Sequence, residues 1–348
     1  MTSHISQSVF IEPPSAHYLG DQFFNLDNLA LNRDGGLQPF ARLREEMQAR
    51  GIAVRTADAL RRGESVSTLN HYWSFGMLNE YSSLLVREDV RLRGFFLLEP
   101  PLTAPHLYKA LPELTRHFER VYVHNTQGDG YSLRGVDRSK LAKVYFPQPF
   151  DRELEPYWDR EQRANKLVVI AGHHHAKFRR PELYSERIKA VASLVDDDAI
   201  DLFGRGWDQW WTKESLWWPY WRNYRALMRA YRGSCVSKHE VLSRYRFSLC
   251  YENMPMTGYL TEKLFDCLYA GTVPVYLGAP DIASLVPPEA YVDMRQFPDT
   301  KTMFAAIKNM PSATWRHMRE AGREFLRGAG KSLYCDAVLN ACFVEVSV

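Results

Sequence analysis

Short apolar runs alternate with stretches of helical periodicity along most of the chain. Up to residue 147 the pattern predicts strands over 93–98 and 120–124 and a helix over 107–118. Beyond residue 165 the alternation is sharper, and it predicts strands over 166–170, 200–203, 247–251 and 273–277 and helices over 182–195, 238–245 and 261–270. Strands separated by helices are typical of βαβ units and parallel sheets.

The two halves of this pattern predict an α/β protein with two Rossmann-like domains whose parallel sheets face each other across a cleft. A length of 348 residues agrees, since a domain commonly takes about 150 residues. Residues 147–166 carry prolines and a dense run of charges, which is typical of a linker. We therefore expect an N-terminal domain over 1–150, a linker over 151–165, a ligand-binding domain over 166–325 and a segment over 326–348 that packs back on the N-terminal domain.

The composition excludes several classes of protein. Apolar residues make up 45% of the chain and charged residues 24%, so the chain is neither disordered nor fibrous. The formal net charge of +3 gives no argument for nucleic acid as a partner. The five cysteines contain no CxxC pair, which argues against a zinc finger or a disulfide scaffold. Aromatic residues, at 13%, are numerous enough to stack on sugar rings as well as fill cores.

The chain shows no long apolar run and no signal-peptide pattern at residues 1–12. We therefore expect a cytoplasmic protein in a reducing compartment.

The segment 258–263 offers a binding site for an anion. Thr261 is predicted to cap the helix over 261–270, and Lys263 falls in the first turn of that helix. A cation there opposes the helix dipole, whereas a bound phosphate would reverse the penalty because helix N-termini bind anions. The competing interpretation is that Lys263 simply extends into solvent.

Arg187 lies on the flank of the apolar stripe of the predicted helix 182–195. An arginine on a largely buried face needs an anionic partner. That partner is either a ligand or an internal carboxylate, for which Glu186 and Asp201 are the candidates.

Glu99 follows the apolar run 95–98 and precedes two prolines. It is predicted to lie on a turn at the carboxyl end of a strand, partly withdrawn from water. Desolvation raises the pKa of a carboxylate toward the range that suits a general base. The alternative is a carboxylate that only caps the turn.

Polar residues also follow two other predicted strands. His173 and His174 come after the strand 166–170, where we interpret them as polar lining; adjacent side chains point in opposite directions, so the three consecutive histidines are not expected to hold one metal. Gly204 and Arg205 form a glycine-rich turn after the strand 200–203.

Residues 247–297, which begin FSLCYENMPMTGYLTEKLF, closely resemble the donor-binding signature of the alpha-1,3/1,4-fucosyltransferase family. The pieces of that signature are an aromatic residue with Glu-Asn, then Tyr-x-Thr-Glu-Lys, then Gly-x-Val-Pro-Val, and all occur here in order. Residues 201–206 are similar to the family's Asp-Val-Tyr-Gly segment. Residues 98–105 resemble its Leu-Glu-Ser-Pro stretch, with Pro100 in place of serine. Residues 1–93 carry no resemblance.

The resemblance implies an inverting glycosyltransferase of the GT-B fold that uses GDP-fucose as donor and needs no metal. Arg187 and Lys263 would bind the diphosphate, and Glu262 would bind sugar or ribose hydroxyls. The other donor-site residues would be Asn253, Tyr259, Glu252, Gly204 and Arg205. Glu99, in an N-terminal acceptor-binding domain, would deprotonate the acceptor hydroxyl, expected to be the 3-OH of a GlcNAc- or Glc-type sugar.

A tryptophan-rich tract over 207–229 departs from the family's pattern. Three interpretations stay open: a helical hairpin packed on the core, a stacking platform for acceptor sugars, or a peripheral contact with a membrane. As a platform it would make Trp210 and Trp211 candidate acceptor-binding residues, together with His173 and His174.

The sequence therefore favours a bacterial-type fucosyltransferase that acts on a surface glycan, such as lipopolysaccharide or a glycosylated protein, or on a lipid-linked oligosaccharide. The alternatives are an enzyme of the same fold with another GDP-sugar donor and a catalytically silent sugar-binding protein. The expected partners are the nucleotide sugar and the glycan acceptor, with no nucleic acid.

Overall fold

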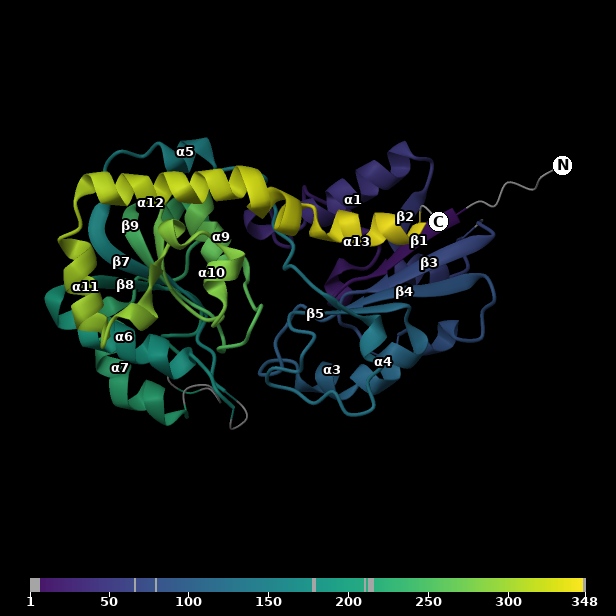
Figure 1. Ribbon diagram of the computed structural model, residues 1–348, viewed down its shortest axis with the longest axis horizontal. Helices are drawn as coiled ribbons and strands as arrows, with labels where there is room; N and C mark the ends of the chain where they lie inside the picture. The colour runs from purple at the N-terminus through teal and green to yellow at the C-terminus, as the bar shows by residue number, and fades with distance from the viewer. Residues whose placement is uncertain are drawn as a thin grey trace. The chain divides into compact units, whose positions relative to one another are not determined.

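The computed structural model describes residues 7–65, 67–78, 80–176, 180–209, 211 and 216–346 and divides into two compact units (Figure 1). The first unit comprises residues 1–149 and 332–348, and the second comprises residues 150–331. Residues 151–165, for which we expected a linker, are part of the second unit and contain helix α5 (Glu155–Trp158), whose Trp158 is buried.

The first unit is built on a six-stranded parallel sheet in the order β2-β1-β3-β4-β5-β6. Its strands are β1 (Gln7–Glu12), β2 (Ala53–Thr56), β3 (Leu69–Ser74), β4 (Val90–Phe96), β5 (Arg120–Val123) and β6 (Leu141–Lys143). Its helices are α1 (Gln38–Ala49), α2 (Ala57–Arg61), α3 (Pro105–Lys109), α4 (Leu111–His117) and α13 (Ala337–Val346).

The helix predicted over 107–118 is two short helices, α3 and α4. Pro112 lies in the first turn of α4. Because proline has no N–H and its ring crowds the carbonyl four residues earlier, a helix cannot run on regularly through this position.

The second unit contains a five-stranded parallel sheet in the order β11-β10-β9-β7-β8. Its strands are β7 (Ala164–Ile170), β8 (Ile200–Phe203), β9 (Tyr245–Tyr251), β10 (Val273–Leu277) and β11 (Val292–Asp293). Its helices, besides α5, are α6 (Tyr184–Leu194), α7 (Trp218–Ala230), α8 (Lys238–Leu242), α9 (Glu262–Tyr269), α10 (Ile282–Leu285), α11 (Thr300–Lys308) and α12 (Ser312–Phe325). The predicted α/β class with two parallel sheets is therefore confirmed.

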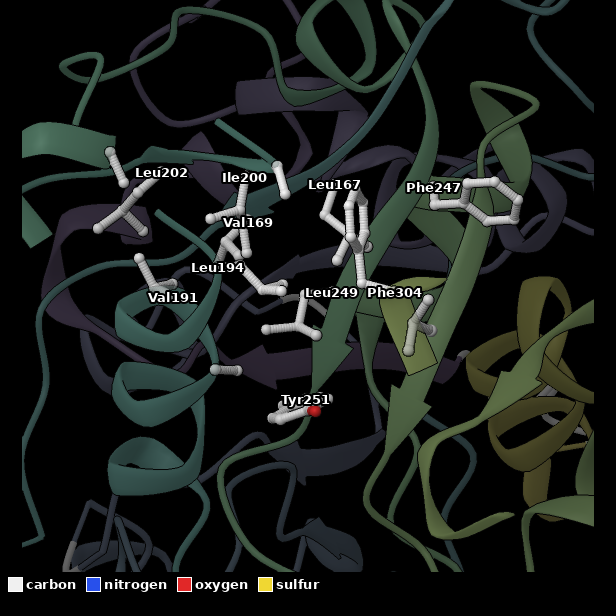
Figure 2. Packing of buried hydrophobic residues seen from close by; sticks show 14 of the residues in the cluster. Leu167, Val169, Val191, Leu194, Ile200, Leu202, Phe247, Leu249, Tyr251 and Phe304 are labelled. Atoms are coloured by element: carbon white, nitrogen blue, oxygen red, sulfur yellow. The ribbon is translucent and has the colours of Figure 1, made fainter. Parts of the chain in front are cut away.

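Alternating apolar residues of the central strands form the core of the second unit. Figure 2 shows Leu167 and Val169 of β7 and Leu249 of β9 packed toward Val191 and Leu194 of α6. Side chains two residues apart on a strand share one face of the sheet, which is why every second residue enters this cluster. Helix α6 packs in turn against α7 and α11 (Figure 1).

The strand order of this sheet predicts the edge at which a ligand would bind. The chain runs from β7 outward to β8 and then returns to the other side of β7 as β9. The loops that follow β7 and β9 therefore leave the sheet in opposite directions, and ligands of open α/β sheets bind at such a point, beyond the carboxyl ends of the strands.

Gly204, the first residue after β8, lies very close to the end of β7. Its φ is +143°, and a Cβ built on it would lie 1.8 Å from the carbonyl oxygen of Ala171. Only glycine fits this backbone position, so the two loops stay close together at the carboxyl edge.

Candidate functional site

A buried carboxylate organises the carboxyl end of β9. Glu252 directly follows this strand and is fully buried. Its carboxylate accepts hydrogen bonds from the Thr261 N–H (2.9 Å), the Thr261 hydroxyl (2.8 Å) and the Lys263 ammonium (3.0 Å). Thr261 does occupy the N-cap position of α9, but its hydroxyl donates to Glu252 rather than capping the helix. Glu252 thereby ties β9 to the first turn of α9.

Lys263 is held in place and does not extend freely into solvent. Its side chain is 21% exposed, and its Nζ contacts Glu252 and, at 3.8 Å, Glu262. Burial alone would lower the pKa of Lys263, but attraction to these two carboxylates outweighs burial and raises the pKa above its ordinary value. The ammonium therefore remains charged in any physiological medium.

Arg187, on α6, is buried beneath the end of β9. Its guanidinium donates to the carbonyl oxygens of Tyr251 (2.5 Å) and Glu252 (3.4 Å) and lies over the Tyr184 ring, 5.8 Å from the ring centre. Burial lowers the pKa of Arg187. Only Nη2 makes these hydrogen bonds, which leaves Nε and Nη1 without a hydrogen bond to any described residue.

Neither of the two carboxylates considered as partners of Arg187 forms an ion pair with it. Asp201 pairs instead with Arg232 (2.8 Å) and Lys166 (3.3 Å), and Glu186 pairs with Lys189. A guanidinium in an apolar setting without a carboxylate favours an anionic ligand, because its donors suit carboxylate or phosphate oxygens.

The loop after β9 also carries Asn253 and Tyr259. The Asn253 amide donates to the Tyr259 hydroxyl at 3.4 Å, and the Asn253 carbonyl accepts from the Leu183 N–H at 2.9 Å. The second contact fixes this loop to the start of α6. The structure thus brings Arg187, Glu252, Asn253, Tyr259, Glu262 and Lys263 to the ends of β9, α6 and α9.

Of the predicted site residues in the loops after β7 and β8, one histidine is buried, whereas the other histidine and the arginine are exposed. His173 is buried, with its ring stacked on Trp207 (4.9 Å between ring centres) and on Tyr220 (4.1 Å). His174 and Arg205 are exposed. The His173 N–H donates to the Arg205 carbonyl at 2.9 Å and so links the two loops.

The tryptophan-rich tract contains helix α7, whose inner face carries the buried Tyr220, Leu227 and Ala230. Trp207 is buried as well, whereas Trp211 is 72% exposed. Trp210 lies outside the described residues. Part of the tract therefore packs on the core as a single helix.

Glu99, in the first unit, is exposed to solvent. We expected it to be partly desolvated, and this is wrong because β4 ends at Phe96 and the chain has left the sheet before Glu99. The Thr103 hydroxyl donates to its carboxylate at 2.9 Å, and the Tyr108 hydroxyl donates to its carbonyl at 3.0 Å.

The sequence analysis missed residues that position Glu99. His124 is buried after β5, and its Nε2 lies 2.8 Å from the carbonyl oxygen of Leu98. Burial lowers the pKa of His124 to about 4, so the ring is neutral and Nε2 donates. Its position at the carboxyl end of the predicted strand 120–124 was the available signal. Tyr184 was also missed at the Arg187 site, because it reads as part of the apolar stripe of α6.

Among the described residues, no group of three or more His, Cys, Asp or Glu side chains is placed to hold a metal, and no helix is long and apolar enough to cross a bilayer.

Comparisons with known proteins relate this part of the chain to a family. Residues 166–319 match the family model of the C-terminal domain of glycosyltransferase family 10 (fucosyltransferase). A stretch of 61 residues is 41% identical to alpha-(1,3)-fucosyltransferase FucT of Helicobacter pylori and covers 18% of this chain and 13% of that protein. A stretch of 72 residues is 38% identical to an alpha-(1,4)-fucosyltransferase of Arabidopsis thaliana and covers 21% of this chain and 18% of that protein. The matches thus span under a fifth of these two relatives.

Solved structures share the fold over most of the chain. The crystal structure of an alpha1,3-fucosyltransferase superposes with a TM-score of 0.52 at 13% identity, covering 93% of this chain and 84% of the other. An alpha-glucosyltransferase in complex with UDP and DNA superposes with a TM-score of 0.60 at 13% identity, covering 97% of both chains. These likenesses show the fold, which is that of GT-B glycosyltransferases. Residues 166–319 of this chain thus resemble the C-terminal domain of glycosyltransferase family 10, the fucosyltransferase family.

Proposed function

We propose that the protein transfers L-fucose from GDP-fucose to a hydroxyl group of a glycan acceptor, with inversion at the anomeric carbon. The observation that carries this proposal is the buried Arg187 guanidinium, which has no carboxylate partner among the described residues and lies at the same strand end as Lys263. Glu252 already pairs with Lys263, so a diphosphate would supply the anionic oxygens that the Arg187 guanidinium lacks. The names of the curated relatives support fucose as the sugar.

In the proposed reaction, an acceptor oxygen forms the new bond to the anomeric carbon of fucose. The bond from that carbon to the β-phosphate oxygen breaks, and its electron pair leaves with GDP. Arg187 and Lys263 stabilise the charge that develops on the leaving diphosphate, because cationic donors fixed in a poorly solvated site need no reorganisation. Glu99 takes the proton of the acceptor hydroxyl.

The finer parts of the proposal are the acceptor, a 3-OH of a GlcNAc- or Glc-type sugar, and the independence from metal. The alpha-(1,3) linkage named for the Helicobacter pylori relative supports transfer to a 3-OH. Two protein cations at the proposed diphosphate site support the second, since they supply the charge that a divalent ion would otherwise provide.

Calorimetry with GDP tests the donor site. Lys263→Ala and Arg187→Ala should each weaken GDP binding by about ten- to a hundredfold, because hydrogen bonds to charged groups contribute about 1.5–3 kcal/mol. The matched controls are Lys301→Ala and Arg316→Ala, exposed cations of the same unit, which should bind GDP as the wild type does. Unchanged GDP affinity in a folded Lys263→Ala protein would remove this residue from the site.

A donor series separates the two alternative functions. Hydrolysis or transfer of GDP-mannose in preference to GDP-fucose would indicate another GDP-sugar as donor. Tight binding of GDP without turnover of any GDP-sugar, with a panel of oligosaccharide acceptors present, would indicate a silent binding protein.

A further inference from the structure

The outer face of α7 gathers exposed tryptophans. Residues recurring at helical spacing on this face are Trp218, Trp221, Arg222, Arg225 and Arg229. Trp218 is 72% exposed and Trp221 37% exposed, and Leu216 just before the helix is 65% exposed. Large apolar side chains that gather on a surface mark an interaction site.

The same face is positively charged. The sequence of α7 contains three arginines and neither aspartate nor glutamate. Arg229 pairs with Asp196 at 2.6 Å. Within the described part of the chain, Arg222 and Arg225 lie in salt-bridge distance of no carboxylate. Among the described residues, this surface therefore offers two cations in no ion pair beside two indole rings, and its partner should be both anionic and able to receive apolar groups.

We propose that this face, formed by Leu216, Trp218, Trp221, Arg222 and Arg225, docks on the surface of a lipid bilayer that contains anionic lipids. Indole rings favour the headgroup level of a bilayer, and arginines are attracted to anionic headgroups. Helix α7 thus presents tryptophan and arginine together on its exposed face, while its other face packs on the protein core.

A sugar-stacking platform fits the same face less well. Sugar hydroxyls both donate and accept hydrogen bonds, whereas the side chains of these five residues include donors but no acceptor. The anionic bilayer accounts for the arginines and the indoles together.

The docking face lies near the carboxyl edge of the sheet. The Tyr220 hydroxyl, in the first turn of α7, donates to the carbonyl of Trp207 at 2.6 Å, and Trp207 follows the end of β8. Arg187 and Lys263 lie at the same edge. Docking would thus hold the proposed donor site near a membrane surface, which suits a lipid-anchored acceptor; this last step rests on the proposed function.

Vesicle sedimentation of the full chain tests the docking. The protein should bind vesicles of phosphatidylcholine with phosphatidylglycerol and should not bind vesicles of phosphatidylcholine alone. It should dissociate in about 0.5 M salt, because the Debye length is then only a few ångströms and the attraction between arginines and headgroups is screened. Arg222→Gln with Arg225→Gln should weaken binding about 25-fold, since one basic residue near the surface is worth about fivefold. Trp218→Ala should weaken it about tenfold or more.

Lys301→Gln with Arg316→Gln, an exposed pair of cations on α11 and α12, is the matched control and should bind vesicles normally. Each variant should keep its circular dichroism spectrum and its GDP affinity, so a failure of docking is distinguishable from a failure of the proposed function. Equal binding to both vesicle types, or normal binding by the arginine and Trp218 variants, would overturn the proposal. So would self-association or single-stranded DNA binding that these variants abolish while vesicles are ignored.

Discussion

Glu252 shows how one side chain can build a site for two others. Its carboxylate holds Thr261 and Lys263, while its backbone carbonyl and that of Tyr251 hold Arg187. Burying a carboxylate is costly unless it is paired and hydrogen-bonded. Here the three donors from the start of α9 satisfy it, and Glu252 thereby fixes the positions of the two cations.

Glu99→Gln should keep the fold and the donor affinity but lose most transfer. The amide keeps the shape and an oxygen that accepts from Thr103, but it cannot take a proton. General-base catalysis contributes about 10²–10⁴-fold, so the turnover number should fall by that factor. Steady-state kinetics against GDP-fucose, with calorimetry for GDP, measures both quantities.

Thr103→Val is the matched control for Glu99→Gln, because it removes the hydrogen bond to the carboxylate but leaves the base. A modest loss is expected there. Turnover near the wild-type value in Glu99→Gln would contradict the assignment, and Asp129 or Glu113 in the same unit would become the next candidates.

Gly204→Ala should destabilise the second unit severely. The new Cβ would lie 1.8 Å from the Ala171 carbonyl oxygen, at a φ of +143° that side-chain-bearing residues rarely adopt. We expect a loss of about 3 kcal/mol or more in the free energy of unfolding, measured by urea denaturation. Gly36→Ala, with its nearest contact at 3.5 Å, is the control and should change stability by about 0.5 kcal/mol at most. Equal effects of the two substitutions would show that the close approach has no energetic weight.

At the scale of elements, a buried charge cluster joins α8 to α9. The Asp266 carboxylate on α9 accepts from Lys238 (2.5 Å) and lies 3.0 Å from Nε2 of His239. Burial alone would raise the pKa of Asp266, but Lys238 and His239 outweigh burial and hold it at about 2, below the ordinary 3.8.

This shift predicts a pH dependence of stability. A carboxylate with a lowered folded-state pKa contributes stability above its unfolded pKa and loses that contribution as the pH falls from about 4 to about 2. Asp266→Asn should therefore cost about 2 kcal/mol at pH 7, and the difference from the wild type should shrink as the pH falls below 4. Urea midpoints at pH 7, 5 and 3 measure it. The exposed Asp197→Asn is the control, and a pH-independent difference for Asp266→Asn would contradict the linkage.

The elements after residue 165 could be predicted because their periodicity agrees with their burial. The predicted strands 166–170, 200–203, 247–251 and 273–277 all exist, since each is an apolar run covered on both faces. Strand β3 was not predicted, because Asn70, His71 and Ser74 are buried in it and interrupt the apolar pattern. Asn70 and His71 are satisfied by Asp89 and Gln7, which lie far away in the sequence.

The candidate site, too, could be predicted only in part from the sequence. Motif and helix-start chemistry indicated Lys263, Glu252 and Arg187, and the structure brings them together. The exposure of Glu99 depends on where β4 ends, and strand ends are poorly encoded in local sequence. Tryptophans lie on both faces around α7, so the sequence alone could not tell its core side from its surface side.

At the scale of the whole molecule, we expect catalysis without a metal ion. Arg187 and Lys263 already provide positive charge at the proposed diphosphate site. Transfer in the presence of EDTA should equal transfer in added Mg²⁺ or Mn²⁺, measured as release of GDP. Loss of activity with EDTA that a divalent ion restores would contradict this account of the leaving group, and a known metal-dependent glycosyltransferase in the same assay serves as the control.

Removing residues 332–348 should destabilise the first unit while sparing GDP binding by the second. These residues include α13, which packs on α1, and Val338, which is buried in the core of the first unit. The Arg42 guanidinium on α1 also donates to the Cys335 carbonyl at 3.3 Å. Calorimetry should show a lowered transition for the first unit, whereas removal of residues 347–348 alone should not. An unaltered transition after the longer truncation would contradict the role of α13.

The return of the chain to the first unit has a consequence for its covalent integrity. The polypeptide passes between the units twice, at 149–150 and at 331–332. A protease that cuts once at 149–150 yields two fragments, of which the C-terminal one still carries α13, an element of the first unit's fold. The nicked halves should therefore co-elute until they are denatured. An exchange of units between relatives must in turn replace the internal residues 150–331, because residues 332–348 belong to the first unit.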